Sequence, residues 1–275
     1  MHFIREAIFK AAAWITGNKV AQRLLRENIR YSQFLIGMGL GDVRLSGEDA
    51  AIRLALKISK GPVCIFDVGA NRGEYTNLVL RCCPGRRVAI HAFEPSQTAA
   101  GSFLENVQAG PDICFNRVAL SSSTGSAQLF YDNPGSVYAS MTQCALLAVV
   151  SKCSKSETIQ MDTLLDYCAC HGIDRIDLLK TDVEGHELEV MRGAGDMLNP
   201  RRIQLIQFEF GTAQAYTRKF FRDFWDLLVP IGYRIARITP SGYLEKISCY
   251  SVDLEVFRTQ NFLAMGPNVY VEDCK

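Results

Sequence analysis

The sequence has no excess of charge of either sign. Its 30 Lys and Arg residues are matched by 29 Asp and Glu residues, which leaves a formal net charge of +1 over 275 positions. Proteins that follow a phosphate backbone carry a basic surface. Nucleic acid is therefore not an expected partner.

Long apolar runs are also missing. The longest uncharged stretch, Asn133 to Ser151, contains Pro134, Gly135 and Gln143, so it is not the run of about 20 apolar residues that a bilayer-spanning helix needs. Near the N-terminus, Lys10 interrupts the apolar stretch that a signal peptide would need. We therefore expect a cytoplasmic protein without a transmembrane helix.

Cysteine is not scarce, but its usual pairing patterns are absent. The ten cysteines show no paired Cys-x-x-Cys spacing, and several of them lie in apolar runs. This usage is typical of reduced thiols in the cytosol. Cys168, Cys170 and His171 resemble metal ligands, but no second pair with matching spacing follows them. We therefore predict no metal site.

The full glycine-rich nucleotide motifs are absent, and a shorter glycine turn stands in their place. In "IFDVGANRGEYTNLVL", residues 65–80, an apolar run ends at Asp67, and Gly69 and Gly73 precede a stretch with helical spacing. This pattern predicts a buried strand, a turn and a helix, with backbone N–H groups of the turn facing a ligand. With two glycines and no G-x-x-x-x-G-K-[ST] sequence, the turn fits neither a dinucleotide nor a triphosphate.

From Val63 onward, short apolar runs alternate with helical stretches. This alternation predicts a doubly wound, mostly parallel α/β sheet with right-handed crossovers. We expect residues 61–275 to form this single domain, closed by an antiparallel strand in the last 25 residues, and residues 1–60 to form a helical N-terminal extension. The expected strands include Val88–Phe93, Ile113–Leu120, Ile176–Leu179, Ile203–Phe210 and Tyr233–Ile238, and the expected helices include Val20–Phe34, Glu48–Ile58, Ser96–Val107, His186–Leu198 and Thr217–Val229.

Carboxylates stand at the ends of four expected strands. They are Asp67, Glu94, the pair Asp182 and Glu184, and Glu209. Ligands of open parallel sheets bind beyond the carboxyl ends of the strands, although an acid at such a position can also cap the next helix. Glu94 follows Gly73 by 21 residues, near the interval at which a strand-end acid meets a ribose hydroxyl. A nucleoside without phosphates, carrying an amino-acid group, fits this pattern, which suggests S-adenosylmethionine.

The ordered motifs resemble those of a known family. "FDVGANRG", "HAFEPS", "VAL", "IDLLKTDVEGHELEVMRGA" and "IQFEF" follow one another between about Ser46 and Phe210, in an order and spacing similar to the FkbM family of S-adenosylmethionine-dependent methyltransferases. The resemblance implies a class I methyltransferase (Rossmann-like) fold, with a seven-stranded sheet whose last strand is antiparallel. It also implies O-methylation of a hydroxyl on a carbohydrate, a glycan or another small-molecule natural product.

The resemblance assigns roles to individual positions. The turn under the methionine part of the cofactor would contain Asp67, Gly69, Ala70, Asn71 and Gly73. The ribose would meet Glu94, with Pro95 and Ser96 alongside, and the adenine would lie by Ala119 within Val118–Leu120. These positions are read directly from the matching motifs.

Methyl transfer also needs an aligned acceptor and a group that takes its proton. Asp182, Glu184 and His186 are the catalytic candidates, with Asp182 or His186 favoured as the base. If His186 is the base, the rate should rise with pH near an imidazole pKa of ~6.5. Asp182 could instead hold a divalent cation, but the sequence reveals no second ligand.

Other residues are candidates for binding the acceptor. The uncharged segment from Tyr131 to Ser151 follows the third strand and is expected to overlie the site, where Tyr138 and Ser140 could touch the substrate. Glu209, at the end of its strand, is a third candidate. A plain surface excursion is the alternative for this segment.

Two other functions are alternatives to a small-molecule methyltransferase. A binding scaffold without turnover is one alternative, and a nucleic-acid methyltransferase is disfavoured because no Asn-Pro-Pro-aromatic motif follows the fourth strand.

The first helix has an amphipathic stripe, which we expect to pack on the domain or on a second chain of a homo-oligomer. Peripheral contact with a membrane surface or a partner is the alternative. The stripe consists of Phe3, Ile4, Ile8, Ala11, Ala12 and Ile15.

Overall fold

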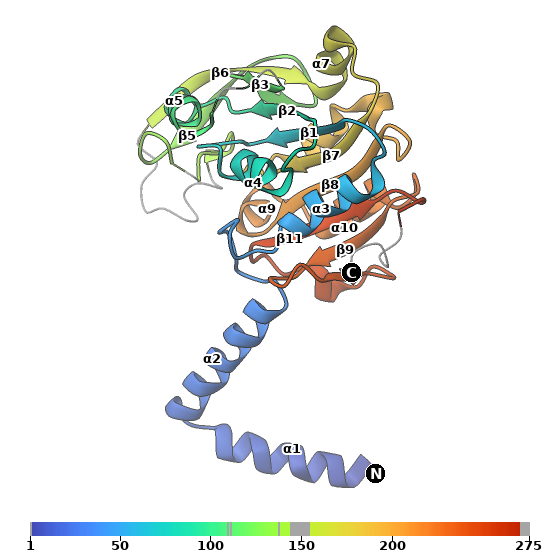
Figure 1. Cartoon of the computed structure of the whole chain (residues 1–275). Helices are drawn as coiled ribbons and strands as arrows, with labels where there is room; N and C mark the ends of the chain where they lie inside the picture. The colour runs from blue at the N-terminus through green and yellow to red at the C-terminus, as the bar shows by residue number, and fades with distance from the viewer. Residues whose placement is uncertain (1, 109, 111, 137, 144–154, 270–275) are drawn as a thin grey trace.

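A computed structural model describes residues 2–108, 110, 112–136, 138–143 and 155–269 of the chain (Figure 1). The helices are α1 (His2–Thr16), α2 (Lys19–Leu35), α3 (Asp49–Ile58), α4 (Glu74–Cys82), α5 (Gln97–Asn106), α7 (Leu164–His171), α8 (Glu187–Arg192), α9 (Thr212–Thr217) and α10 (Phe221–Leu228). The strands are β1 (Val63–Val68), β2 (Val88–Phe93), β3 (Ile113–Asn116), β4 (Ala119–Ser121), β5 (Gly125–Tyr131), β6 (Lys155–Thr163), β7 (Ile176–Thr181), β8 (Ile203–Phe210), β9 (Arg234–Ile238), β10 (Leu244–Lys246) and β11 (Gln260–Met265).

The main sheet has eight strands in the order β10-β9-β11-β8-β7-β1-β2-β3. Strands β1, β2, β3, β7 and β8 are parallel, whereas β11 runs antiparallel to both β8 and β9. The predicted doubly wound sheet with an antiparallel closing strand is therefore confirmed. The predicted number of seven strands is one too small, because the chain after β9 turns back and adds the short antiparallel strand β10 at the edge.

The alternation of side chains along the strands builds two cores. On one face, Ile65 and Leu178 pack with residues of α3 and α4, including Ile52. On the other face, Phe66 and Leu179 pack with residues of α7, α8 and α10. Because successive strand residues point to opposite faces, each strand supplies both cores. Helix α3, which lies within the expected extension 1–60, is thus packed into the body of the domain.

A second, three-stranded sheet interrupts the alternation of strands and helices. Its order is β4-β6-β5, and it leads the chain from the edge strand β3 to α7. The single strand expected over Ile113–Leu120 is wrong, because the chain leaves the main sheet after Asn116 and pairs again at Ala119 with β6. The expected helix Thr217–Val229 starts later, at Phe221, because Arg218 takes a left-handed conformation (φ +56°) that ends α9.

The N-terminal helices α1 and α2 project from the body (Figure 1). No residue of α2 is buried, and the packing of the first helix on the domain or on a second chain stays a prediction. Among the described residues, no helix has both the length and the apolar character to cross a membrane. The seven described cysteines are all unpaired thiols.

Candidate active site

A cavity lies beyond the carboxyl ends of β1 and β7, where the strand order changes direction. It has a volume of about 660 Å³, which is within the usual range for a small-molecule site. Its walls come from residues 39–48, the turn after β1, the ends of β2, β7 and β8, and residues 136–141. Parallel sheets place their ligand sites at this switch point, so the topology and the cavity agree.

The turn after β1 is held by a close backbone approach and by buried polar contacts. A Cβ atom at Gly69 (φ +82°) would lie 1.8 Å from the carbonyl oxygen of Asp182, so the turn and the end of β7 are in direct contact. Asp67 is fully buried and does not line the cavity; its Oδ2 accepts a hydrogen bond from Thr76 Oγ1 at 2.7 Å. Gly73 also lies behind the wall, against Val107. Asp67 and Gly73 thus shape the turn without facing its ligand.

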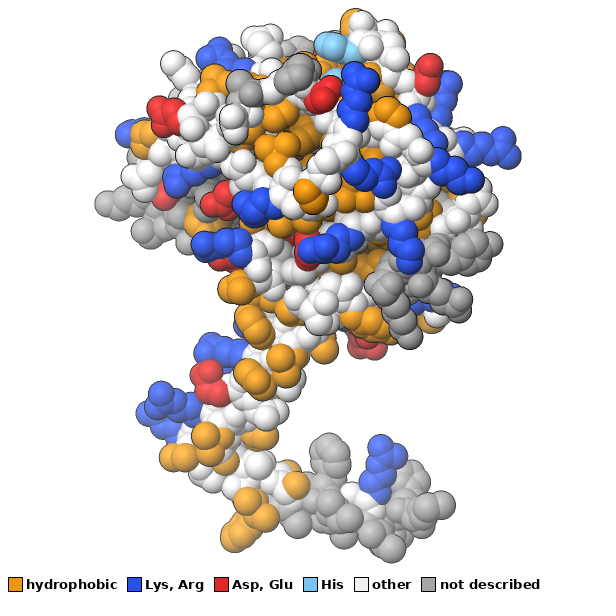
Figure 2. All heavy atoms as spheres, in the orientation of Figure 1, with side chains coloured by type: hydrophobic (Ala, Val, Ile, Leu, Met, Phe, Trp, Pro, Cys, Tyr) orange, Lys and Arg blue, Asp and Glu red, His pale blue; other side chains and the backbone are white. Residues whose placement is uncertain are grey.

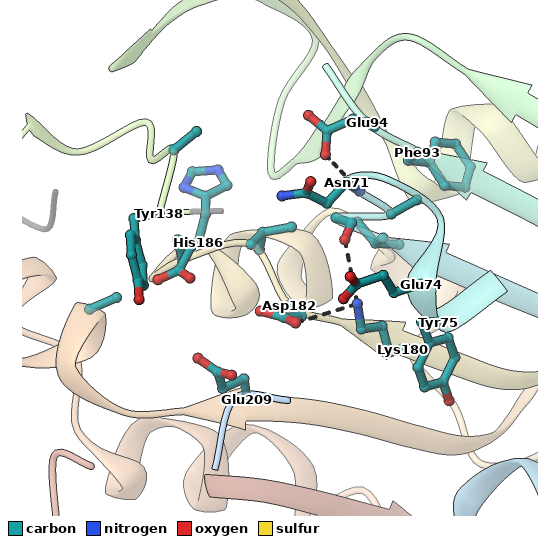
Figure 3. A pocket seen from close by; sticks show the side chains of 18 of the residues that line it. Asn71, Glu74, Tyr75, Phe93, Glu94, Tyr138, Lys180, Asp182, His186 and Glu209 are labelled. Atoms are coloured by element: carbon teal, nitrogen blue, oxygen red, sulfur yellow. Dashed lines mark hydrogen bonds and ion pairs between the residues drawn. The ribbon is translucent and has the colours of Figure 1, made fainter. Parts of the chain in front are cut away.

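Asn71 and Glu94 meet inside the cavity (Figure 3). The backbone N–H of Asn71 donates to Glu94 Oε2 at 3.0 Å, and the N–H of Ser96 donates to Oε1 at 2.9 Å. Burial raises the pKa of Glu94 to about 7, against the opposing effect of these two donors. The side-chain oxygen of Asn71 is buried and has no hydrogen-bond partner among the described residues. The Glu94 carboxyl group and the side-chain oxygen of Asn71 can therefore both accept hydrogen bonds from a ligand.

The neighbouring wall is apolar. Phe93, Pro95 and the stretch Val118–Leu120, which contains Ala119, line it. Ser96 does not line the cavity; its hydroxyl accepts from Ala99 N and caps α5. An apolar wall beside a buried carboxyl group can receive a flat ring attached to a ribose.

Lys180 forms ion pairs both with Asp67 of β1 and with Asp182 after β7. The sequence analysis did not identify it. Its Nζ atom lies 3.4 Å from Asp182 Oδ2 (Figure 3). It also lies 3.3 Å from Asp67 Oδ1. Burial alone would lower the pKa of Lys180, but the carboxylates of Asp67 and Asp182 outweigh it and raise the pKa above its ordinary value. A lysine within the apolar run "IDLLKT" was the available signal, because a buried strand carries a charge only where it is paired.

Hydrogen bonds to Glu187 hold the turn after β7 in place. The sequence analysis assigned no role to this residue. Glu187 is buried, and its Oε1 accepts from the N–H groups of Val183 and Gly185 at 2.9 and 3.1 Å. Its Oε2 accepts from Gln214 Nε2 at 2.7 Å. These bonds fix the turn, in which Glu184 has a left-handed backbone (φ +51°).

Three carboxyl groups lie close together where β7 and β8 end at the cavity. Oxygens of Asp182, Glu184 and Glu209 lie within 4.8 Å of one another, a set that could also hold a metal ion. Burial raises the pKa of Glu184 and that of Glu209 well above the usual range, and the nearby Asp182 carboxylate adds to both shifts. The sequence offered Asp182 no second ligand; the fold supplies two carboxyl groups from separate strand ends.

His186 lies at the start of α8 and lines the same cavity. Its Nε2 atom is 3.0 Å from Ser121 Oγ. Burial lowers the pKa of His186 to about 4, and the positive charge of Lys219 acts in the same direction. If His186 is the base, its titration should therefore lie below the value of ~6.5 expected for an unperturbed imidazole.

The segment after β5 reaches the cavity with some of its described residues. Tyr138 lines the cavity and is exposed, on the side where His186 lies in Figure 3. Ser140 is buried and is not among the lining residues; its hydroxyl donates to the carbonyl oxygen of Glu184 at 2.8 Å. Ser140 therefore supports the turn that carries Glu184. The part of the expected segment at residues 144–151 lies outside the described residues.

Some known proteins are similar to this chain in sequence or in structure. The sequence model of the methyltransferase FkbM domain matches residues 67–235. Hexuronic acid methyltransferase AglP of Haloferax volcanii is 28% identical over 169 residues, which make up 61% of this chain and 64% of AglP. Methyltransferase FkbM from Methylobacillus flagellatus aligns with 86% of this chain and 59% of its own, at 13% identity and a TM-score of 0.47. Fibrillarin of Aeropyrum pernix, crystallised with S-adenosyl-L-methionine, aligns with 79% and 73% of the two chains, at 13% identity and a TM-score of 0.40.

Proposed function

The chain belongs to the methyltransferase FkbM domain family, and from this premise we propose that it transfers a methyl group from S-adenosylmethionine to a hydroxyl of a carbohydrate or natural-product acceptor. The observation that carries the proposal is the placement of two groups in one cavity. Asn71 and Glu94 stand at one end, and Asp182, Glu184 and Glu209 stand at the other. The first group suits a nucleoside with an amino-acid tail, and the second suits a polyhydroxylated molecule.

The residues at the nucleoside end fit S-adenosylmethionine. Glu94 would accept the ribose hydroxyls, the apolar stretch Val118–Leu120 would contact the adenine, and the unpaired Asn71 oxygen would accept from the ammonium group. When bound, the cofactor supplies an electrophilic methyl group on a sulfonium. The chain's part is to orient the acceptor and to exclude competing water, which accounts for much of the effect in such displacements.

At the acceptor end, Asp182 is the favoured proton acceptor. It lines the cavity beside Lys180, whose Nζ atom lies 3.4 Å from Asp182 Oδ2. The raised pKa values of Glu184 and Glu209 keep these two groups protonated over a wider pH range. They can therefore donate to hydroxyl oxygens of the acceptor while Asp182 accepts the proton of the reacting hydroxyl. A sugar agrees with the acceptor class named for the relative AglP.

A turnover assay tests the proposal. The purified chain is incubated with S-adenosylmethionine and a panel of neutral sugars, uronic acids and their glycosides, and formation of S-adenosylhomocysteine is measured. Once an acceptor is found, Asp182→Asn should keep its affinity for S-adenosylhomocysteine and lose about 10²–10⁴-fold in kcat. Asp196→Asn, at an exposed position outside the cavity, is the matched control and should turn over normally.

The alternatives give different results. A scaffold protein would bind S-adenosylhomocysteine but yield no product with any acceptor of the panel. Wild-type turnover by Asp182→Asn would remove Asp182 from the mechanism and leave His186, which His186→Ala would then test. Loss of activity in EDTA with recovery on adding Mg²⁺ would mean that the three carboxyl groups act through a cation.

A further inference from the structure

Helix α2 exposes an apolar face that nothing in the described part of the chain covers. Its large apolar side chains project into solvent along one side of the arm (Figure 2). Trp14, near the end of α1, is 86% exposed, and Ile15 is 64% exposed. The exposed apolar residues of α2 are Val20, Leu24, Leu25, Ile29, Tyr31, Phe34 and Leu35.

The opposite face of α2 is basic. Lys19, Arg23, Arg26 and Arg30 follow one another at helical intervals, so they share one side of the helix. Residues 2–35 contain six basic and two acidic side chains, a net charge of +4, although the whole chain carries only +1. The positive charge is therefore concentrated on the projecting arm.

Within the described part of the chain, the hydrogen bonds that join the arm to the body lie near the base of the arm. A hydrogen bond joins Gln33 to Arg258, and Gly39 N donates to the carbonyl oxygen of Thr259 at 2.7 Å. Next to this base, Phe34 and Leu35 are still 40% and 54% exposed, and a contiguous exposed apolar face marks an interaction surface. The partner that binds this apolar face must therefore also accommodate the positive charges beside it.

We propose that residues 2–36 bind in the plane of an anionic lipid bilayer, with the apolar face of α2 and Trp14 in the headgroup region. An amphipathic helix with Lys and Arg on its polar face binds such surfaces, and Trp and Tyr prefer this depth. Each basic side chain near an anionic surface strengthens binding about fivefold. A second copy of the chain would bring another net charge of +4 against the first, which opposes pairing through the arms.

The arm leads directly into the wall of the cavity. Gly39, Gly41 and Arg44 follow α2 within nine residues of its end and line the cavity. A bilayer that binds α2 therefore lies near the wall of the cavity that these three residues form. This inference is independent of the proposed chemistry, since it concerns where the chain resides and not which bond it forms.

Vesicle flotation of the full chain tests the proposal. We expect binding to vesicles of phosphatidylcholine with 30% phosphatidylglycerol, little binding to pure phosphatidylcholine, and release at high salt. Replacing Arg23, Arg26 and Arg30 together by Gln should weaken binding by about 100-fold. Leu24→Asp with Leu35→Asp should abolish it. Leu104→Asp with Val252→Asp changes exposed apolar residues of the body and should leave binding unchanged.

Three outcomes would overturn the proposal. The first is no binding to either kind of vesicle, the second is equal binding to both, and the third is unchanged binding by the Leu24→Asp/Leu35→Asp variant. A dimer in sedimentation that this variant abolishes, together with absent vesicle binding, would assign the face to a second copy of the chain. Affinity for S-adenosylhomocysteine, measured on every variant, reports that the body is folded.

Discussion

Asp67 and Lys180 are two buried charges that depend on each other. Their charged atoms lie 3.3 Å apart, and the side chains are 0% and 6% exposed. Lys180→Met should lower the free energy of unfolding by about 3–5 kcal/mol, because it leaves a buried carboxylate without its partner. Urea denaturation measures this. The double variant Asp67→Asn/Lys180→Met should regain part of the loss, and a double variant no more stable than the single one would argue against the pairing.

Glu94 gives the cofactor site a pH dependence. Its pKa is raised to about 7 by burial, and the ionised form accepts hydroxyl donors more strongly than the protonated form. The affinity for S-adenosylhomocysteine should therefore rise about tenfold between pH 6 and pH 8, and binding near pH 7 should release protons. Calorimetry in two buffers measures both effects. Glu94→Gln should bind weakly and show neither, and an unchanged pH dependence in this variant would assign the titration to another group.

At the residue scale, the sequence predicted positions better than contacts. The strand-end rule and the interval from Gly73 brought out Glu94, and the fold does place Glu94, Asn71 and Asp182 in one cavity. Lys180 and Glu187 were missed because their roles come from partners 113 and 27 residues away, Asp67 and Gln214. Ser140 was expected to touch substrate, but a side chain's direction depends on the packing of its neighbours, and here it points to Glu184.

At the scale of elements, the turn after β1 depends on Gly69. Gly69→Ala should weaken S-adenosylhomocysteine binding and lower the melting temperature, because the left-handed backbone disfavours a side chain and its Cβ would meet the carbonyl oxygen of Asp182. Calorimetry and thermal denaturation measure these effects. Gly61→Ala is the control, since a Cβ there meets nothing within 4 Å. Equal effects of the two substitutions would show that the turn does not depend on glycine at position 69.

The elements themselves were largely predictable, with instructive exceptions. Apolar periodicity located β1, β2, β7, β8 and β9, because strands buried on both faces read as apolar runs. It could not separate β3 from β4, because two short apolar stretches flank Asn116 and Arg117 and read together as one strand, whereas the chain changes sheets between them. It also could not tell whether the amphipathic N-terminal helix covers the body, because the pattern records that a face is apolar and not what it meets.

At the scale of the whole molecule, the arm and the body should be separable. Deleting residues 1–31 should leave the melting temperature of the body within about 2 °C, because a contact-poor surface element contributes little to stability. The affinity for S-adenosylhomocysteine should also stay unchanged, since the lining residues begin at Gly39. Differential scanning calorimetry checks the first statement. A fall of 10 °C would mean that α1 and α2 are part of the folding unit.

The position of β11 has a consequence for how the chain is made. Strand β11 comes last among the described strands but pairs with both β8 and β9 in the interior of the main sheet. During synthesis, β8 and β9 therefore keep unpaired edges until Met265 has left the ribosome, and unpaired edges invite association with other chains. Nascent chains stalled before Gln260 should recruit chaperones, and chains extended well past Met265 should release them.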